Sequence, residues 1–466
     1  MKSKLFFSIQ LLAIALMTGC SSVTKFEPLQ DVSIPETWSE ASGVSIQKDE
    51  PWWKEFNDPL LDTLIDQALQ TNSDFAVAVI RVRRARLQAG LADTNLTPAV
   101  VIGANAGITK TLDPETTTKS SGVTSSISYE IDLWGKLANL REAANLELEA
   151  TEDDCHVFAL SLLGTTTRLY WQVAYLNRLL KLSDSDIESA EKARTLTRAR
   201  FDAGAVSDLN NVQAELNLYN QQALRSQLVQ QRVEARHALA LLLNKPPQSD
   251  VPDPAGLPDA PMPPVAAGIP ADVLSRRPDM HAAELRLRGA LVNVEIARTS
   301  FYPTFSLTGT LGTVSTELTN LSQNPVATLG AGLSLPFVQW NTTQLTIAVS
   351  KSQYEEAVVN YRQRLYTALT EVEDSLSART QLQAQEVKLN FAKTQALRAE
   401  RIAHTRFDEG FTDILQWLDA QASLRSAERA FILNRLNQLN NQVNLYKALG
   451  LGASSNLVQC RHNPKG

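Results

Sequence analysis

The chain has 466 residues, 44% of them apolar and 20% charged, which is typical of a folded protein long enough for two or three domains. Its formal net charge is −6 and it has no basic stripe, so the sequence excludes a partner bound through nucleic-acid phosphates. The three cysteines, Cys20, Cys155 and Cys460, are too few for a disulfide framework. Cys155 and Cys460 could pair in an oxidising compartment, but nothing in the sequence indicates that they meet.

Residues 1–19 have the features of a signal peptide. Two lysines precede the apolar core FFSIQLLAIALM, and the small-residue end TGC follows it. This end, followed by two serines, resembles the bacterial lipoprotein box, in which Cys20 becomes the N-terminus and carries S-diacylglycerol and N-palmitoyl groups. Ser21, where an aspartate would indicate the inner membrane, then favours the outer membrane, and residues 20–49 would be a lipidated extended segment. The alternative is an ordinary secretory signal with a chance cysteine.

The remaining chain consists of two copies of one plan. Residues 73–107 align without a gap on residues 278–312, and RFDAGAVSDLNNVQAE (200–215) recurs as RFDEGFTDILQWLDAQ (406–421). Between the copies lies a stretch too rich in proline for a helix or a central strand. The alignment predicts a first repeat, a proline-rich linker, a second repeat and a C-terminal tail, at residues 50–246, 247–271, 272–450 and 451–466.

Each repeat is predicted to contain a helix, two strands, a long helix, a short break and a second helix. Residues 350–409 contain neither glycine nor proline and are rich in good helix formers, which predicts a rod of about 90 Å. Helices of this length are typical of coiled-coil packing. Gly204 and Gly410 end the two rods, so the recurring segments are predicted to be helical hairpin tips, at about 203–208 and 409–413.

Four strands are expected, at about 98–111, 121–134, 303–313 and 327–338. Apolar residues alternate in them with serine, threonine or glycine, over the length of a strand that crosses a bilayer in a barrel. A soluble antiparallel sheet with one buried face would show the same period. Four strands cannot close a transmembrane barrel, and lipid does not tolerate open strand edges, so several copies would have to pool their strands. Two copies would supply eight strands and three copies twelve, and the repeat alone does not choose between them.

A family resemblance rests on motifs spread through the chain: PWWKEFNDPLLDTLIDQAL, SYEIDLWGKL, LSRRPDMHAAELRLRGA, SFYPTFSLTG, the two tip segments and LNNQVNLYKALG. In their order and duplication they resemble the TolC-type outer-membrane factors, and more narrowly the OprM/NodT-like lipoproteins of efflux systems. The resemblance implies a mainly α protein with a β-barrel part. It would be a homotrimer with one twelve-stranded outer-membrane barrel, continued by a periplasmic α-helical barrel.

The same resemblance implies partners and a function. The helical tips would meet a periplasmic adaptor protein and an inner-membrane pump of the RND type or another type. The chain would then be a passive exit duct for drugs or other small molecules in a Gram-negative bacterium. The sequence FVQWNT stands where relatives often have Phe-Asp-Gly-Gly, so the loop at the periplasmic rim of the barrel is expected to turn differently.

The resemblance also assigns roles at the tips. Relatives close the tube with rings of Asp and Leu, which would fall here on Leu415 and Asp419 as the periplasmic gate. Three carboxylates near a three-fold axis would repel one another and favour cations. The alternative for Asp419 is an exposed carboxylate in an ordinary surface pair. The expected adaptor-facing residues of the two tips are Gly204, Ala205, Gly410 and Phe411.

The sequence contains no pattern that indicates an enzyme. Its five histidines are scattered without the spacing of a metal site, and no nucleophile elbow, phosphate-binding loop or CxxC motif occurs. No catalytic residue, metal or cofactor is expected apart from the lipid on Cys20. Two alternatives to drug efflux remain: an exit channel for protein secretion with the same fold, and a structural coiled-coil lipoprotein without a pore.

Overall fold

The computed structural model describes residues 33–39, 51–265, 267–315, 325–452 and 460. The predicted signal peptide and Cys20 therefore lie outside the described residues, as does most of the predicted tail. The described residues form two compact units. The first contains Gln88–Glu147 and Leu285–Asn360, and the second contains Ser33–Leu87, Leu148–Glu284 and Tyr361–Gly466.

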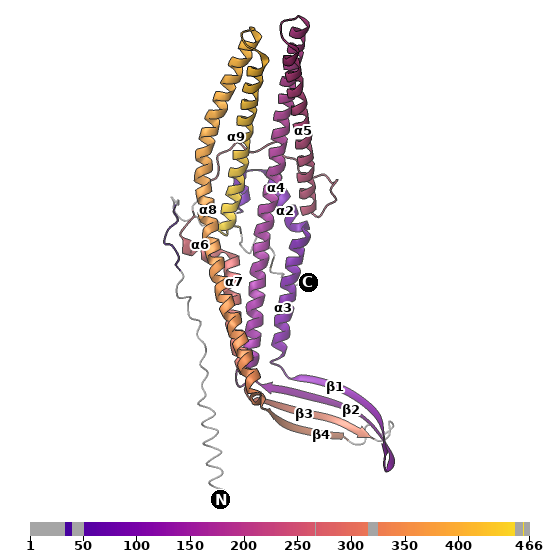
Figure 1. Ribbon diagram of the computed structural model, residues 1–466. Helices are drawn as coiled ribbons and strands as arrows, with labels where there is room; N and C mark the ends of the chain where they lie inside the picture. The colour runs from indigo at the N-terminus through magenta and orange to yellow at the C-terminus, as the bar shows by residue number, and fades with distance from the viewer. Residues whose placement is uncertain (1–32, 40–50, 266, 316–324, 453–459, 461–466) are drawn as a thin grey trace. The chain divides into compact units, whose positions relative to one another are not determined.

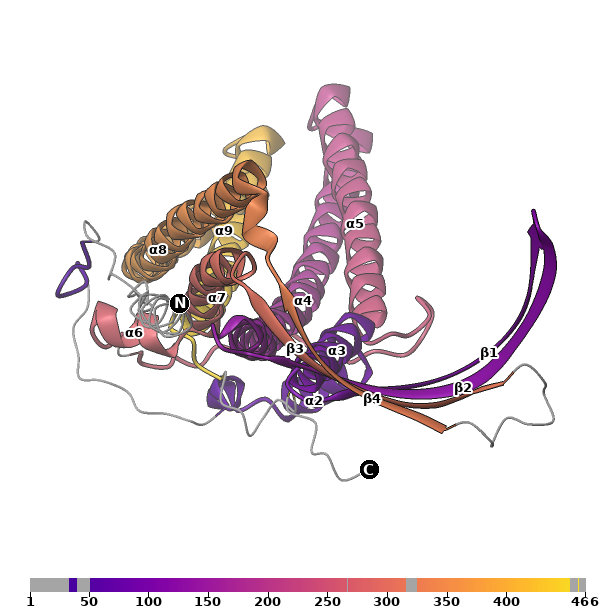
Figure 2. The same ribbon diagram turned by 90° about the horizontal axis from the view of Figure 1, so that it is seen from below.

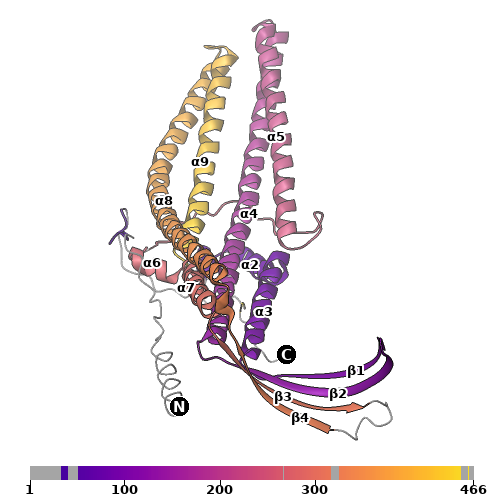
Figure 3. The same ribbon diagram turned by 60° about the horizontal axis from the view of Figure 1, so that its bottom comes forward.

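The first unit contains a four-stranded antiparallel sheet in the order β1-β2-β3-β4 (Figure 3). Its strands are β1 (Ala99–Leu112), β2 (Glu115–Ile131), β3 (Thr304–Ser315) and β4 (Pro325–Ser334). The expected start of the second strand at about residue 121 is wrong, because only Asp113 and Pro114 separate β1 from β2. The polar run ETTTKS is rich in β-branched threonine, and each of its residues pairs with a residue of β1.

The second and fourth strands also end earlier than expected, at Ile131 and Ser334, and a helix begins within a few residues of each end. The Asp132 carboxylate accepts hydrogen bonds from the backbone N–H groups of Leu137 (3.1 Å) and Ala138 (2.8 Å), so it caps the start of the next helix. After β4 a short 3₁₀ helix, η3 (Pro336–Val338), occupies part of the FVQWNT departure. The chain turns into helix at both places instead of continuing the sheet.

The chain also forms two long helical hairpins, and the two helices of each hairpin run side by side (Figure 1). The first hairpin is α4 (Lys136–Asp202) with α5 (Asp208–Leu242), and the second is α8 (Trp340–Asp408) with α9 (Ile414–Ala448). At 67 and 69 residues, α4 and α8 are each about 100 Å long. Gly164 does not interrupt α4; a Cβ there would lie 3.3 Å from Val443 Cγ1, so the glycine permits close packing of α9.

The remaining helices are shorter and lie before the strands of each repeat. They are η1 (Trp52–Phe56), α2 (Pro59–Thr71), α3 (Ser73–Thr94), α6 (Pro270–Arg276) and α7 (Pro278–Thr299). The described residues between Lys245 and Ile269 form neither helix nor strand, and the chain there is held by arginines of the long helices. Arg435 Nε donates to the Pro258 carbonyl at 2.8 Å, and Arg379 Nη2 donates to the Pro263 carbonyl at 2.9 Å.

The main core of the second unit is rich in aromatic side chains from both repeats. Trp52 of the PWW motif stacks on Tyr446 of α9, with ring centroids 5.3 Å apart, and Phe56 meets Trp171 of α4 edge to face at 4.7 Å. Leucines of α2, α4, α5 and α9 fill the rest of the cluster. The core therefore joins the N-terminal motif of the first repeat to the last helix of the second.

Candidate channel wall and helical tips

The sheet has one apolar face and one polar face. Residues directly opposite each other in an antiparallel pair point to the same side, so the register assigns whole rows of side chains to each face. Rows on the apolar face include Val100, Ile127, Gly309 and Leu329; Tyr129, Leu307 and Ala331; and Ile131, Phe305 and Leu333. Rows on the polar face include Gly103, Thr124, Gly312 and Val326; Ala99, Ser128, Thr308 and Gly330; and Glu130, Ser306 and Gly332.

The sheet is strongly curved, and its two outer strands each have an open edge (Figure 2). Within the described residues, β1 pairs only with β2 and β4 pairs only with β3. All residues of β1 and β4 are exposed in the single chain, including Ile102 and Leu329. Within a bilayer, such a row of unpaired backbone groups is stable only when another strand pairs with it.

Both helical tips are built on the same turn. Gly204 (φ +72°) and Gly410 (φ +78°) adopt the left-handed conformation that side chains disfavour. In the first tip the Gly204 N–H donates to the Phe201 carbonyl and the Ala205 N–H donates to the Arg200 carbonyl, both at 2.8 Å. The second tip repeats both bonds, from Gly410 and Phe411, at 3.0 and 2.9 Å. These paired bonds are a Schellman motif, which satisfies the last carbonyls of α4 and α8.

The two tips differ in the residue that fills their interior. Trp417 of α9 is only 4% exposed and stacks on Phe407 of α8 at 5.3 Å and on His404 at 4.5 Å. Its Nε1 donates to Glu400 Oε1 at 2.9 Å. The equivalent residue of the first tip is the buried Asn211. Trp417 is not among the residues predicted from the sequence, although the alignment of the two tips sets Trp417 against Asn211.

Arg200 joins the two tips and was also missed by the sequence analysis. Its Nη1 donates to the Phe407 carbonyl at 2.7 Å, and its Nη2 donates to the Asp408 carbonyl at 2.9 Å. The guanidinium carbon lies 4.3 Å from the centroid of the Phe407 ring. A cation therefore sits at the negative, C-terminal end of the α8 dipole. Ala193, Ala214 and Ile414 complete the apolar cluster around this contact.

The predicted gate residues lie on the opposite side of α9 from this cluster. Leu415 and Asp419 are four residues apart and so share one helix face, and both are exposed, Leu415 to 44%. Gln416 is exposed beside them. The Asp419 carboxylate makes no ion pair with the described residues of this chain. The alternative reading, in which Asp419 belongs to an ordinary surface ion pair, therefore finds no partner residue here. The gate role stays a prediction, because it depends on neighbouring copies.

The apical residues point to solvent at both tips. Gly204, Ala205 and Gly410 are exposed, and Phe411 is 72% exposed. A single exposed apolar side chain is common on protein surfaces, so the exposure of Phe411 does not by itself identify a contact. The contact of these tip residues with an adaptor stays a prediction.

A charged cluster ties α9 to the first hairpin farther from the tips. Arg429 Nη2 lies 3.2 Å from Asp186 Oδ2, and Arg425 Nη2 donates to Asn217 Oδ1 at 3.3 Å. Burial raises the pKa of Asp186, although Arg425 and Arg429 oppose the rise. Burial is also the main cause of the raised pKa of Glu428. These groups make the packing of α9 on α4 and α5 dependent on charge as well as on apolar contact.

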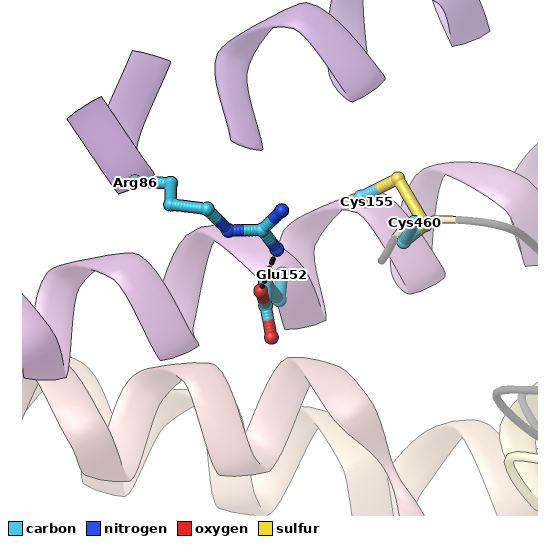
Figure 4. Close-up of a disulfide and its surroundings, with 4 residues drawn as sticks. All are labelled: Arg86, Glu152, Cys155 and Cys460. Atoms are coloured by element: carbon cyan, nitrogen blue, oxygen red, sulfur yellow. Dashed lines mark hydrogen bonds and ion pairs between the residues drawn. A yellow bond between two sulfur atoms is a disulfide. The ribbon is translucent and has the colours of Figure 1, made fainter. Parts of the chain in front are cut away.

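Cys155 and Cys460 form a disulfide, which the sequence had left open (Figure 4). Their Cα atoms are 6.0 Å apart, although 305 residues separate them along the chain. Nearby, Arg86 Nη2 of α3 contacts Glu152 Oε1 of α4 at 2.8 Å. In the part of the chain that the structure describes, no group of three or more potential ligands could hold a metal ion. The described helices likewise include none that is apolar over a sufficient length to span a bilayer.

Comparisons with known proteins identify relatives along nearly the whole chain. The profile of the family described as Outer membrane efflux protein matches residues 64–245 and 269–451. The pyoverdine export outer membrane protein OpmQ of Pseudomonas putida is 31% identical over 454 residues, covering 95% of this chain and 96% of that protein. The probable efflux pump outer membrane protein TtgC of the same species is 30% identical and covers 94% of this chain and 93% of that protein.

Solved structures show the same architecture. The open state of the MtrE outer membrane channel of Neisseria gonorrhoeae superposes with a TM-score of 0.82 at 30% identity, covering 93% of this chain and 99% of that chain. The outer-membrane channel OprN gives a TM-score of 0.82 at 28% identity, covering 91% of this chain and 99% of that chain. Both similarities include the sheet and the long helical hairpins, because they extend over nine tenths of the chain.

Proposed function

Because the chain belongs to the outer membrane efflux protein family and is an efflux channel of that membrane, we propose that it forms a homotrimeric exit duct. Three copies pool their strands into one barrel of twelve, and the helical hairpins continue the duct into the periplasm. The observation that carries this proposal is the sheet, with an apolar face, a polar face and two open edges. In lipid these edges must pair, and β1 of one copy can pair with β4 of the next.

The copy number and the edge pairing can be tested together by cross-linking. Ala104 on β1 and Ala331 on β4 both lie on the apolar face, and the paired variant Ala104→Cys with Ala331→Cys carries one new thiol near each open edge. A short flexible bismaleimide should join this variant into species of up to three chains in membranes. Each single variant is the matched control and should stay at one chain. Cross-linked species of no more than two chains, or no cross-linked species, would contradict the trimer.

The duct works with a periplasmic adaptor and an inner-membrane pump of the RND or another type, which supply the energy of transport. The names of the relatives support this part of the proposal, since OpmQ is a pyoverdine export outer membrane protein and TtgC is a probable efflux pump outer membrane protein. Small organic compounds are therefore the proposed cargo. Cross-linking from Phe411 at the exposed tip, followed by mass spectrometry, should recover an adaptor. Recovery of only the chain itself from cells that carry out efflux would contradict a three-part assembly.

Leu415 and Asp419 form the periplasmic gate in this proposal, and Cys20 carries the lipid anchor. The shared exposed face of the first two residues supports the gate, because nothing in their own hairpin covers them. The signal ending in TGCSS supports the anchor. Cys20→Ala should abolish incorporation of labelled fatty acid, while a chain that still takes up the label would refute acylation at this residue.

A further inference from the structure

The buried disulfide joins the end of the second repeat to the middle of the first. Cys155 lies in α4, and Cys460 lies twelve residues beyond the end of α9 at Ala448. Cys155 is 1% exposed and Cys460 is 0% exposed. Both belong to an apolar cluster with Phe75, Ala78 and Val82 of α3 and with Ala159 and Leu162 of α4. The C-terminal cysteine therefore packs as a core residue between two helices of the first repeat.

The described residues that follow α9 include two glycines in a tight turn. The Gly450 N–H donates to the Lys447 carbonyl and the Leu451 N–H donates to the Tyr446 carbonyl, both at 3.0 Å, so α9 ends in a Schellman turn. Gly450 (φ +70°) and Gly452 (φ +84°) both have left-handed backbone conformations. A Cβ at Gly450 would lie 3.2 Å from the Arg276 carbonyl oxygen, and one at Gly452 would lie 3.0 Å from Trp52 Cδ1. The two glycines therefore allow the backbone to approach the Arg276 carbonyl and the Trp52 ring closely.

We propose that Cys155 and Cys460 are the site of an oxidative modification, made by a dithiol oxidase of the periplasm, that clasps the C-terminal tail permanently onto α3 and α4. The clasp is structural rather than a redox switch. The observation that supports this is burial: both sulfurs lie among apolar side chains of α3 and α4, where a reducing thiol has little access to them. The inference rests on the outer-membrane location, since the periplasm is an oxidising compartment.

The reaction balances as a thiol–disulfide exchange. The thiolate of one cysteine attacks the disulfide of the oxidase and forms a mixed disulfide, releasing one oxidase thiolate. The thiolate of the other cysteine then attacks the sulfur of the first, forms the Cys155–Cys460 bond and releases the second oxidase thiolate. The two oxidase thiolates take up the two protons that the cysteines lose, and the oxidase gains two electrons. Because the closed cluster buries both sulfurs, oxidation must occur before the tail has packed.

Mass spectrometry of the native protein tests the bond directly. Peptides from protein purified without reductant should contain Cys155 linked to Cys460, and iodoacetamide should label neither cysteine. Dithiothreitol should leave the bond intact in the folded trimer and reduce it after denaturation. Free alkylatable thiols in the purified protein would overturn the proposal, and reduction of the bond in the folded trimer within minutes would overturn the permanent clasp.

The role of the disulfide in stability can be separated from the channel function in two ways. One is a cysteine-free variant, and the other is production of the parent chain in a strain that lacks the dithiol oxidase. The double variant Cys155→Ala with Cys460→Ala should lose its trimer at a temperature several degrees lower, with unchanged single-channel conductance. The parent chain made without the oxidase should have free thiols, and its trimer should dissociate at the same lowered temperature. The dissociation temperature of the double variant should be the same with and without the oxidase. A parent chain equally heat-stable with and without the bond would overturn the structural role. Absence of conductance in both chains would refute the proposed channel and not the clasp.

Discussion

Replacing Arg200 with alanine should loosen the end of α8 at the second tip. The change removes two hydrogen bonds from a charged donor, to the carbonyls of Phe407 at 2.7 Å and Asp408 at 2.9 Å. It also removes the contact of the guanidinium with the Phe407 ring at 4.3 Å. Bonds from charged groups contribute about 1.5–3 kcal/mol each when buried, and a cation over a ring about 0.5–2 kcal/mol. Because the site is half-exposed and water replaces the lost donors, we expect a net loss of about 2–3 kcal/mol.

Hydrogen exchange measures this loss at the residues concerned. A change of about 2–3 kcal/mol corresponds to roughly 30–150-fold in the local opening equilibrium. The amides of Gly410 and Phe411, which bond back to α8, should therefore exchange faster by about that factor. Arg200→Lys keeps the charge but cannot bridge both carbonyls with one planar group, so its effect should be intermediate.

Arg406 provides a matched control within the same chain. It occupies the position of Arg200 in the second copy of the tip, and its exposed side chain makes no hydrogen bond or ion pair with the described residues. Arg406→Ala should leave the exchange of the same amides within about twofold of the parent, as expected for a surface substitution. Equal acceleration in the two alanine variants, or none in Arg200→Ala, would refute the assignment of a specific bond between the tips.

Three further predictions concern the gate, the tip interior and the sheet. Asp419→Ala should increase the conductance of the purified channel in planar bilayers, while Gln213→Ala, at the equivalent position of the first tip, should not; equal conductance of the parent and Asp419→Ala would remove the gate role. Trp417→Ala should cost about 3–5 kcal/mol of local stability, seen as faster proteolysis at the second tip, because it empties a buried site. Gly122→Ala should destabilise the sheet by about 1–3 kcal/mol through overpacking, since the new Cβ would lie 2.6 Å from a backbone oxygen of β3. On gels, the trimer of this variant should dissociate at a lower temperature than the parent. Gly103→Ala, where nothing lies within 4 Å, should behave as the parent.

The features that the sequence predicted are those that depend on local chemistry. Gly204 and Gly410 were identifiable because a helix that ends in the left-handed conformation requires glycine. The alternation in β3 was readable because each strand residue faces one of two environments. The start of β2 was misjudged because a threonine-rich run has the composition of a loop, although its pairing with β1 makes it a strand.

Features that depend on contacts between distant segments could not be predicted. The disulfide joins residues that are 305 positions apart, and no periodic pattern encodes the path of the chain between them. Arg200 has a counterpart in Arg406 with the same neighbours in sequence, and only the packing of the two hairpins gives one of them its partners. The burial of Trp417 in the second tip could not be predicted for the same reason, because residues of α8 cover this side chain rather than residues of its own turn.

The disulfide also changes what a break in the backbone would do. The bond closes a loop that contains β3, β4, the linker between the repeats and both helical tips, while β1 and β2 lie outside it. A protease that cuts once anywhere inside this loop produces two polypeptides that remain one covalent molecule. The linker can therefore be cleaved at its exposed residues Pro247, Gln248 and Asp250, which lie outside helices and strands, without releasing either repeat.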